Sequence, residues 1–308
     1  MDFKNKLFLL PMADVTGSQF RILCKKYGAD IVCTELISVN AIVRNNERTN
    51  RLIFRTPIES PVGIQLFGTN PEIIKEAAII VRDNFDFIDF NLGCPSVKIT
   101  NQGAGASLLK RKNKVEEILR ALISGAGNKP VTIKMRSGFD EKHLSYNEIG
   151  KIAEDCGVAA IAMHGRTAVA GYSDNYNWDW IKELKETVNV PVIGNGNIVS
   201  GESCKQMFEQ TKCDSIMVGR AAIGYPFIFR EIKAYLKDGN KLEKASIKER
   251  LETYLSIGKN LDFSAAKQHA LWFTSGLEGS AQMRVQISSF RDYAHIEKYF
   301  KKIIEVSE

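Results

Sequence analysis

The stretch PVIGNGNIVSGESCKQMFEQTKCDSIMVGRAAIG, residues 191–224, decides the fold class of this chain. Two short and nearly continuous apolar runs, at 191–198 and 214–221, flank the helical pattern GESCKQMFEQTKC at 201–213. Apolar runs of this kind are typical of parallel strands that are covered on both faces, with a helix connecting them. The stretch therefore predicts a strand–helix–strand unit with parallel strands.

Six similar runs precede this unit, and each is bounded by turn residues. These predicted strands are KLFLLPMA (6–13), ADIVCTEL (29–36), PVGIQLFG (61–68), FDFIDFNLG (85–93), PVTIKMRSG (130–138) and AAIAMHGRT (159–167). Helical patterns lie between most of the strands, for example at 70–84, 146–157 and 178–188. Eight strands that alternate with helices predict a (β/α)8 barrel, the TIM barrel, over residues 1–240. The rival is a doubly wound sheet, which ordinarily has a glycine-rich turn after its first strand, and the sequence has none there.

The strand pattern stops after residue 240. Four helical stretches follow, at 246–261, 264–277, 280–290 and 294–306. The polar segment KDGNKLE (237–243) has the composition of a linker. We therefore predict a second, all-helical domain over residues 241–308.

The composition is that of a globular protein with an ample core, since 44% of the residues are hydrophobic and 25% are charged. No apolar run reaches the roughly 18–20 residues of a membrane span, so we expect a cytoplasmic protein without a signal peptide. The six cysteines form no C-x-x-C pair, which argues against a metal site and a disulfide framework. The formal charge of +6 permits an anionic partner such as nucleic acid. We expect a monomer.

The carboxyl-terminal ends of the predicted strands carry mostly polar residues. They are Met12, Glu35, Gln65, Asn91, Lys134, His164, Asn195 and Arg220. In a barrel these ends share the face that bears the active site, so we predict one common pocket. The last two strands end in GNGNI and VGRAAIG, whose glycines let the backbone approach a phosphate closely. The alternative is that these glycines serve only tight turns.

Two cationic residues at the strand ends have several interpretations. Lys134 interrupts an apolar run, and a lysine is almost never buried without a partner, so it could hold an electron-rich ring or a carboxylate. His164 could be a structural histidine, but the adjacent Gly165-Arg166 favours an anion site.

The stretch DFNLGCPS, residues 89–96, places Cys94 just after a buried strand. A metal ligand is disfavoured because no ligand-like array of Cys and His accompanies it. A nucleophile would need a base partner or a depressed pKa, whereas a protonated thiol could donate a proton. The following glycine-rich, polar loop is a poor place for a packing thiol, which favours a chemical role.

Five motifs, in the order NLGCPS…GAGASLL, KMRSG, MHGRT, GNGNI and VGRAAIG, resemble the tRNA-dihydrouridine synthase family. The opening PMADVTGSQFR and the segment KQHALWFTSGLEGSAQMR also fit, so the resemblance covers nearly the whole chain. It implies a flavin mononucleotide (FMN) barrel joined to a helical tRNA-binding domain. It also implies an enzyme that reduces a uridine of tRNA to dihydrouridine, with NADPH or NADH as the reductant.

The resemblance assigns roles residue by residue. It implies that FMN is bound by Pro11, Met12, Ala13, Gln65, Lys134, His164, Asn195, Gly196, Asn197, Gly219 and Arg220. Cys94 would be the acid that protonates uracil C5 after hydride from flavin N5 reaches C6, which requires a base taken out of its stack. The implied substrate contacts are Asn91, Arg166, Lys267, His269 and Arg284. Trp272 matches the same segment, although core packing is the simpler interpretation for it.

The chain departs from the family pattern at two positions. Gly17 stands where an Asp is frequent, which would alter the start of the first helix, and Asn197 stands where Asp or Gly is frequent. Asn tolerates unusual backbone angles, so we expect flavin binding to persist.

A cationic run and two rival functions complete the prediction. The run KRKNK (110–114) could contact phosphate or could simply be a solvated helix start. The rivals are an FMN oxidoreductase of a free pyrimidine, of the dihydroorotate or dihydropyrimidine type, and a non-catalytic tRNA-binding barrel.

Overall fold

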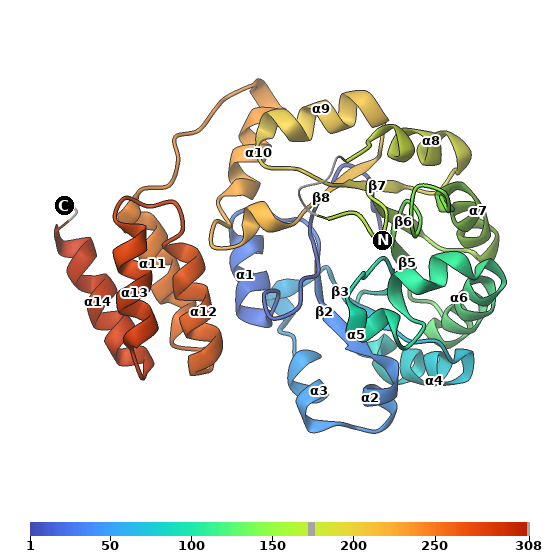
Figure 1. Cartoon of the computed structure of the whole chain (residues 1–308), viewed down its shortest axis with the longest axis horizontal. Helices are drawn as coiled ribbons and strands as arrows, with labels where there is room; N and C mark the ends of the chain where they lie inside the picture. Colours follow the sequence, from blue (N-terminus) through green and yellow to red (C-terminus); the bar gives the residue numbers. More distant parts are fainter. Residues whose placement is uncertain (172–175, 307–308) are drawn as a thin grey trace.

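The computed structural model describes residues 1–171 and 176–306, and eight parallel strands form its centre (Figure 1). The strands are β1 (Leu7–Leu9), β2 (Val32–Ser38), β3 (Val62–Phe67), β4 (Phe87–Leu92), β5 (Val131–Arg136), β6 (Ala160–His164), β7 (Val192–Asn195) and β8 (Ser215–Val218). Seven of the predicted strands contain one of them, and β2 overlaps the prediction at 29–36 but continues to Ser38. The strand order is β1-β8-β7-β6-β5-β4-β3-β2, so the first strand pairs with the last.

The sheet closes between β1 and β2. Phe8 and Ile31 form a parallel bridge there, and the N–H of Leu9 donates to the carbonyl oxygen of Ile31 at 3.0 Å. A doubly wound sheet is open and would leave its edge strands apart. The predicted TIM barrel is therefore confirmed, and the doubly wound alternative is wrong.

Helices surround the barrel. They are α1 (Ser18–Lys26), α2 (Val39–Val43), α3 (Glu47–Leu52), α4 (Pro71–Val81), α5 (Val97–Thr100), α6 (Lys112–Ala126), α7 (Tyr146–Cys156), α8 (Asp179–Thr187), α9 (Gly201–Thr211) and α10 (Ile228–Asp238). Short 3-10 turns occur at η1 (Pro57–Glu59), η2 (Arg82–Asn84), η3 (Gly105–Lys110) and η4 (Arg220–Ala222). Local chemistry sets the helix starts: the side chain of Asn70 accepts the N–H of Glu72 at 2.9 Å, and Pro71 occupies the first turn.

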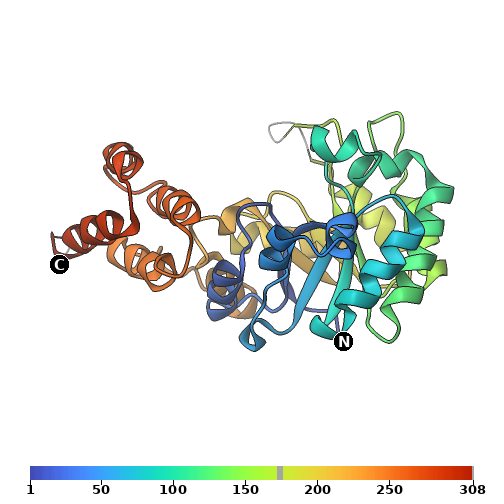
Figure 2. The same cartoon turned by 90° about the horizontal axis from the view of Figure 1, so that it is seen from below.

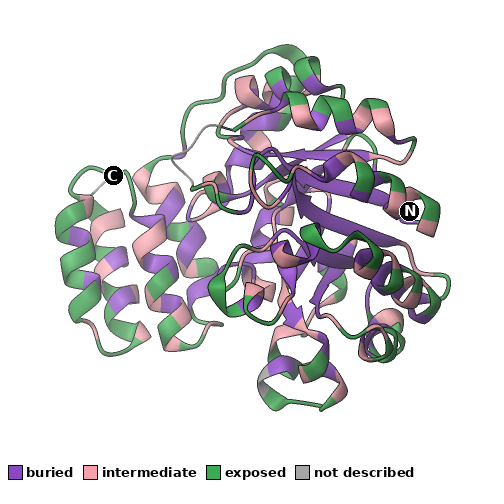
Figure 3. Ribbon diagram, turned by 45° about the vertical axis from the view of Figure 1, so that its right-hand side comes forward, coloured by how far each residue is buried: buried purple, intermediate pink, exposed green. Residues whose placement is uncertain are grey.

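The barrel interior is layered. A separate buried cluster contains residues of five strands, together with Phe3 and Ile31, which precede β1 and β2. Its members are Phe3, Phe8, Ile31, Phe87, Ala160, Ala162, Ile193 and Met217. Further along the same strands the inward positions become polar, as at Asp89 and Asn91 on β4. The strands are almost wholly buried (Figure 3), so these polar side chains lie in a dry environment that leads up to the carboxyl ends.

Four helices follow the barrel and lie to one side of it (Figure 2). They are α11 (Ile247–Gly258), α12 (Phe263–Phe273), α13 (Ser280–Ser289) and α14 (Tyr293–Val306). All four predicted helical stretches are thus found, while residues 307 and 308 of the predicted domain lie outside the described residues. We keep residues 1–240 and 241–308 as the proposed division into domains.

The barrel and these helices are in contact at several places. The hydroxyl groups of Tyr27 and Thr253 lie 2.8 Å apart. Gly224, with a φ of +66°, approaches α12 so closely that a Cβ atom on it would overlap the carbonyl oxygen of Trp272. In the described parts of the chain, none of the helices has the length and hydropathy of a bilayer-spanning segment.

Candidate active site

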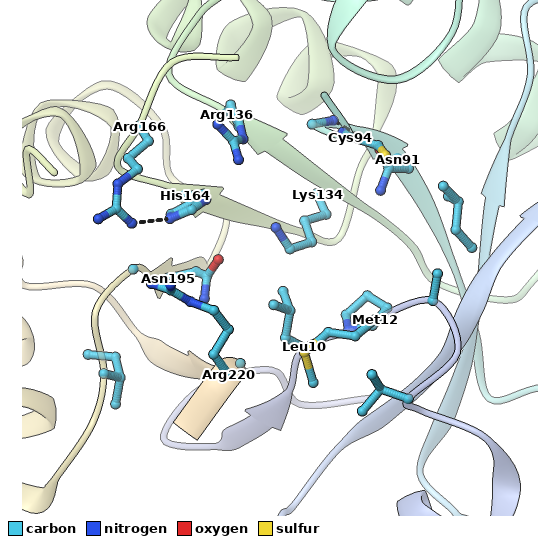
Figure 4. Close-up of a pocket in the computed structure, with 18 of the residues that line it drawn as sticks. Leu10, Met12, Asn91, Cys94, Lys134, Arg136, His164, Arg166, Asn195 and Arg220 are labelled. Atoms are coloured by element: carbon cyan, nitrogen blue, oxygen red, sulfur yellow. Dashed lines mark hydrogen bonds between the residues drawn. The ribbon is translucent and has the colours of Figure 1, made fainter. Parts of the chain in front are cut away.

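A cavity of about 630 Å³ opens at the carboxyl ends of the strands. All the residues predicted to bind a cofactor line it, and so does Cys94. They are Pro11, Met12, Ala13, Gln65, Lys134, His164, Asn195, Gly196, Asn197, Gly219 and Arg220. Figure 4 shows Lys134 in the middle of the cavity, Cys94 and Asn91 on one side, and His164 and Arg166 on the other. The predicted common pocket is therefore confirmed for seven of the eight strand ends.

Glu35 is the exception, and its predicted place in the pocket is wrong. The pairing of β2 with β3 shifts register between Cys33 and Leu36, and Leu36 lines the cavity instead. The Oε2 atom of Glu35 accepts the N–H of Asp14 at 2.6 Å. Burial raises the pKa of this carboxyl group. Glu35 thus holds the loop after β1, which supplies Met12 and Ala13 to the pocket wall.

The pocket is strongly cationic. Lys134, Arg136, Arg166 and Arg220 all line it, together with His164. Burial, followed by the charge of Arg136, lowers the pKa of Lys134 to about 8. Burial, followed by the neighbouring cations, lowers the pKa of His164 well below its usual value, so this imidazole is neutral at pH 7. Such a site suits an anion.

The neutral His164 has a defined role in the hydrogen bonding. Its Nε2 atom lies 3.2 Å from Nη1 of Arg166. A guanidinium group can only donate, so Nε2 is the acceptor and the imidazole proton is on Nδ1. The Nη2 atom of Arg166 donates to Oδ1 of Asn197 at 3.2 Å, which ties the ends of β6 and β7 together.

The two predicted glycine loops make close approaches. Gly196 has a φ of +133°, and a Cβ atom on it would lie 3.1 Å from Cδ2 of His164. Asn197 follows with a φ of +55°, a backbone angle that Asn tolerates better than most residues. A Cβ atom on Gly219 would lie 2.6 Å from Cδ2 of Leu10. Any side chain at Gly196 or Gly219 would displace the neighbouring wall of the pocket.

The loop that carries Cys94 is held from both sides. Oδ1 of Asn91 accepts the N–H groups of Gly93 at 3.0 Å and Cys94 at 2.8 Å. The carbonyl oxygen of Cys94 accepts the N–H of Ala106 at 3.0 Å. The thiol is half-buried and faces the pocket. Among the described residues, no group of His, Cys, Asp and Glu could hold a metal ion.

A chain of buried polar groups lies beneath this loop. Nδ2 of Asn91 donates to Oε1 of Gln65 at 3.0 Å, and Nε2 of Gln65 donates to Oδ2 of Asp89 at 2.6 Å. The hydroxyl of Thr132 donates to the other carboxylate oxygen of Asp89 at 2.6 Å. Sequence reasoning missed Asp89 and Arg136. The available signals were the spacing of Asp89 two residues before Asn91, on the same strand face, and that of Arg136 two residues after Lys134.

A family profile described as "Dihydrouridine synthase (Dus)" matches residues 8–305. The chain belongs to the dihydrouridine synthase family. The tRNA-dihydrouridine synthase B of Shewanella oneidensis is 34% identical over 98% of this chain and 97% of its own length. The tRNA-dihydrouridine synthase B of Pseudomonas aeruginosa is 35% identical over 94% of this chain and 89% of its own. The family resemblance stated from the motifs is confirmed.

Solved structures support the barrel fold. A morphinone reductase variant in complex with tetrahydroNAD has a TM-score of 0.55 at 12% identity, covering 78% of this chain and 88% of that one. The old yellow enzyme homologue from Zymomonas mobilis has a TM-score of 0.52 at 11% identity, covering 80% and 92%. At these identities the likeness shows the fold alone.

Gly17, which departs from the family pattern, immediately precedes α1. Glycine offers no side chain that could accept an N–H from the first turn of this helix. Ser18 donates its hydroxyl to Oε1 of Glu59 at 2.7 Å, which anchors the helix start in another way. A Cβ atom on Gly17 would lie 4.0 Å from Oε1 of Glu35, so an aspartate at this position would bring two carboxylates together.

The residues that the family resemblance assigns to RNA differ in accessibility. Arg284 is exposed on α13. The ammonium group of Lys267 donates to the carbonyl oxygens of Ser288 at 2.6 Å and Phe290 at 3.1 Å. Lys267 therefore bonds the carbonyl groups at the end of α13. Arg284 is the better candidate for an RNA contact.

Two further side chains of this set are buried. Arg166 is 2% exposed and belongs to the pocket with His164 and Asn197. His269 is 3% exposed, and its ring lies 5.4 Å from that of Phe20 and 4.9 Å from that of Trp272. Neither side chain lies on the outer surface, so Arg166 could contact only a nucleotide that enters the pocket, and both assignments remain predictions.

The cationic run at 110–114 leads into α6 and is largely engaged with other groups. The ammonium group of Lys110 lies 3.3 Å from the centre of the Phe139 ring. Lys112 pairs with Glu148, and Lys114 pairs with Glu117 at 2.7 Å. These contacts favour the interpretation as a solvated helix start. Arg111, which is exposed, is the member of the run best placed to contact phosphate.

Proposed function

We propose that this protein reduces a uridine of tRNA to 5,6-dihydrouridine, using FMN in the described pocket and NADPH or NADH as the electron source. The family assignment over nearly the whole chain supports the reaction, and the relatives named as tRNA-dihydrouridine synthases support the substrate. Neither a free-pyrimidine oxidoreductase nor a non-catalytic tRNA-binding barrel is favoured by these relationships. We expect a monomer in the cytoplasm.

The observation that carries the proposal is that Cys94, on a hydrogen-bonded loop, lines a pocket rich in cations and glycines. The pocket's chemistry fits FMN: a cluster of cations and two glycine loops suit one phosphate group, and Gln65 and Lys134 suit the polar edge of the ring. We assign the phosphate end to His164, Asn197 and their neighbours, and the ring end to Lys134 and Gln65. When bound, the flavin supplies the hydride that the reduction needs.

The residues of the chain supply the rest of the chemistry. Uracil C5 must receive a proton when C6 receives the hydride, and Cys94 is our proposed proton donor. Lys134 carries its charge below a pH of about 8 and would stabilise negative charge at the ring end. A base between the flavin and the thiol must be flat and unstacked, which fits a nucleotide taken out of an RNA stack.

The test is stopped-flow reoxidation of the pre-reduced flavoprotein by tRNA. We expect Cys94→Ala to bind FMN and to be reduced by NADPH at the wild-type rate, because neither step uses the thiol. Its reoxidation by tRNA should slow by about 10²–10⁴-fold, the usual effect of losing a positioned proton donor. Cys156→Ala, which changes a half-buried thiol on α7 outside the pocket, is the matched control.

Each alternative for Cys94 gives a different result. A structural thiol predicts a lower melting temperature with reoxidation kept, and a nucleophile predicts a covalent protein–RNA adduct during turnover. Reoxidation of the alanine variant at the wild-type rate would rule out Cys94 as the acid. Release of the cofactor by heat and its chromatography test the flavin directly, and the recovery of FAD or of no flavin would overturn that assignment.

A further inference from the structure

We propose that Asp89 is a positioning residue for Cys94, and that it acts through the hydrogen-bonded side chains of Gln65 and Asn91. The inference rests on the proposed function of Cys94 as the proton donor. Asp89 is separated from the Cys94 loop by these two amides, so its action would be indirect.

The direction of the hydrogen bonds in this chain follows from the backbone groups at its loop end. At one end, the backbone N–H groups of Gly93 and Cys94 can only donate, so the Asn91 atom that faces them is its oxygen. Nδ2 of Asn91 must then face Gln65, which accepts with Oε1 and donates with Nε2. At the other end, Nε2 of Gln65 can only donate, so Oδ2 of Asp89 is the acceptor. An amide in place of the Asp89 carboxylate could turn either its oxygen or its nitrogen toward Gln65, so it would not fix the orientation of Gln65.

The strand register places these groups side by side. Gln65 on β3 pairs with Asp89 on β4, and Asp89 pairs with Thr132 on β5. Asn91 follows Asp89 by two residues and therefore points to the same face of the strand. The barrel backbone, rather than a mobile loop, thus sets the spacing between the carboxylate and the amides.

All four side chains lie in the dry interior. The exposed fractions are 1% for Gln65, 5% for Asp89, 7% for Asn91 and 3% for Thr132. Burial raises the pKa of Asp89, whereas the donors from Gln65 and Thr132 and the charge of Lys134 oppose the rise. With little water available as a substitute, a group that loses its partner here stays unsatisfied, which is costly. A substitution of Asp89 should therefore change the hydrogen bonding of Asn91 through Gln65.

A reversal of the chain provides the test. In Asn91→Asp, a carboxylate oxygen would face Oε1 of Gln65, and two acceptors would meet. If Gln65 turned to relieve this contact, its Oε1 would meet the carboxylate of Asp89. Adding Asp89→Asn removes the conflict. The new carboxylate at position 91 then accepts from Gln65 and from the loop, Gln65 accepts from the new amide at position 89, and the oxygen of that amide accepts from Thr132. The double variant restores every donor–acceptor pair with the same net charge.

The measurement compares reduction by NADPH with reoxidation by tRNA in four flavoproteins: wild type, Asp89→Asn, Asn91→Asp and the double variant. We expect Asn91→Asp to lose at least about tenfold in reoxidation, equivalent to about 1.4 kcal/mol. Because Asn91 and Gln65 also line the flavin pocket, reduction by NADPH is measured on each variant, and the tenfold loss is expected in the ratio of reoxidation to reduction. The double variant should recover most of the loss.

The outcomes separate the possibilities. A double variant as slow as Asn91→Asp, or a parallel fall of reduction and reoxidation, would overturn the positioning role. If Asn91→Asp cannot be purified, recovery of a folded, tRNA-reactive protein by the added Asp89→Asn supports the inference, and failure of that recovery overturns it. Wild-type protein that is not reoxidised by tRNA would instead refute the proposed function.

Discussion

The burial of His269 predicts a measurable loss of stability in mild acid. This histidine lies on α12, packs between the rings of Phe20 and Trp272, and is 3% exposed. Its Nδ1 atom has no hydrogen-bond partner among the described residues. Burial lowers the pKa of His269 to about 4. The imidazole therefore stays neutral in the folded protein at pH values where it would be charged in the unfolded chain.

The sign and the size of the effect follow from proton binding. Below a pH of about 6.5 the unfolded chain takes up a proton at this residue and the folded protein does not, so the free energy of unfolding falls as the pH falls. Each pH unit corresponds to about 1.4 kcal/mol, so His269 should cost about 2 kcal/mol at pH 5. The cost should level off near roughly 3 kcal/mol as the pH approaches the folded-state pKa of about 4.

The assay is urea denaturation at pH 7.5 and pH 5.0. His269→Leu cannot be protonated, so its free energy of unfolding should fall between these pH values by about 2 kcal/mol less than that of wild type. His295→Leu is the matched control, because His295 is exposed on α14 and bonds to Asp292 at 2.8 Å. The lowered pKa of His164 affects all three proteins alike and cancels from the comparison. Parallel losses in wild type and His269→Leu would refute the reasoning.

Three further predictions concern the pocket, the cationic run and the contact between barrel and helices. Burial lowers the pKa of Lys134 to about 8, so its charge is lost above that pH and the affinity for FMN should then fall. In fluorescence titrations, the affinity of Lys134→Met for FMN should depend less on pH. Neutralising the four cations of the run at 110–114 should weaken tRNA binding mainly through Arg111, because the other three already have partners. The slope of log affinity against log salt should become shallower by about 0.7–0.9 for each lost phosphate contact, and an unchanged slope would leave the run as a solvated helix start. Gly224→Ala should lower the melting temperature and weaken tRNA binding more than Gly239→Ala does. Both glycines have a positive φ, but only a Cβ atom at position 224 would overlap Trp272. Equal effects of the two substitutions would contradict this.

The barrel and most of the pocket could be predicted because they depend on patterns that are local in sequence. Apolar runs with polar ends indicated every strand, and the parallel topology then brings residues such as Asn91 and Lys134 to one face. The exceptions depend on three-dimensional detail. A register shift in β2 moves Glu35 out of the pocket, and no sequence pattern shows where a pairing irregularity will fall. The burial of His269 depends on how α12 packs against α1, a contact between residues far apart in the chain.

The contact of Gly224 with Trp272 bears on how members of this family could be recombined. The pocket is lined by Gly219, Arg220 and Ile223, which lie just before Gly224. One loop therefore forms part of the pocket wall and also contacts α12. A chimaera spliced between α10 and α11, at residues 239–246, would separate α12 from the loop that contacts it. A splice placed before Gly219 would transfer α12 together with the loop that contacts it. The unit to exchange is therefore the four C-terminal helices together with α10 and the loop after β8.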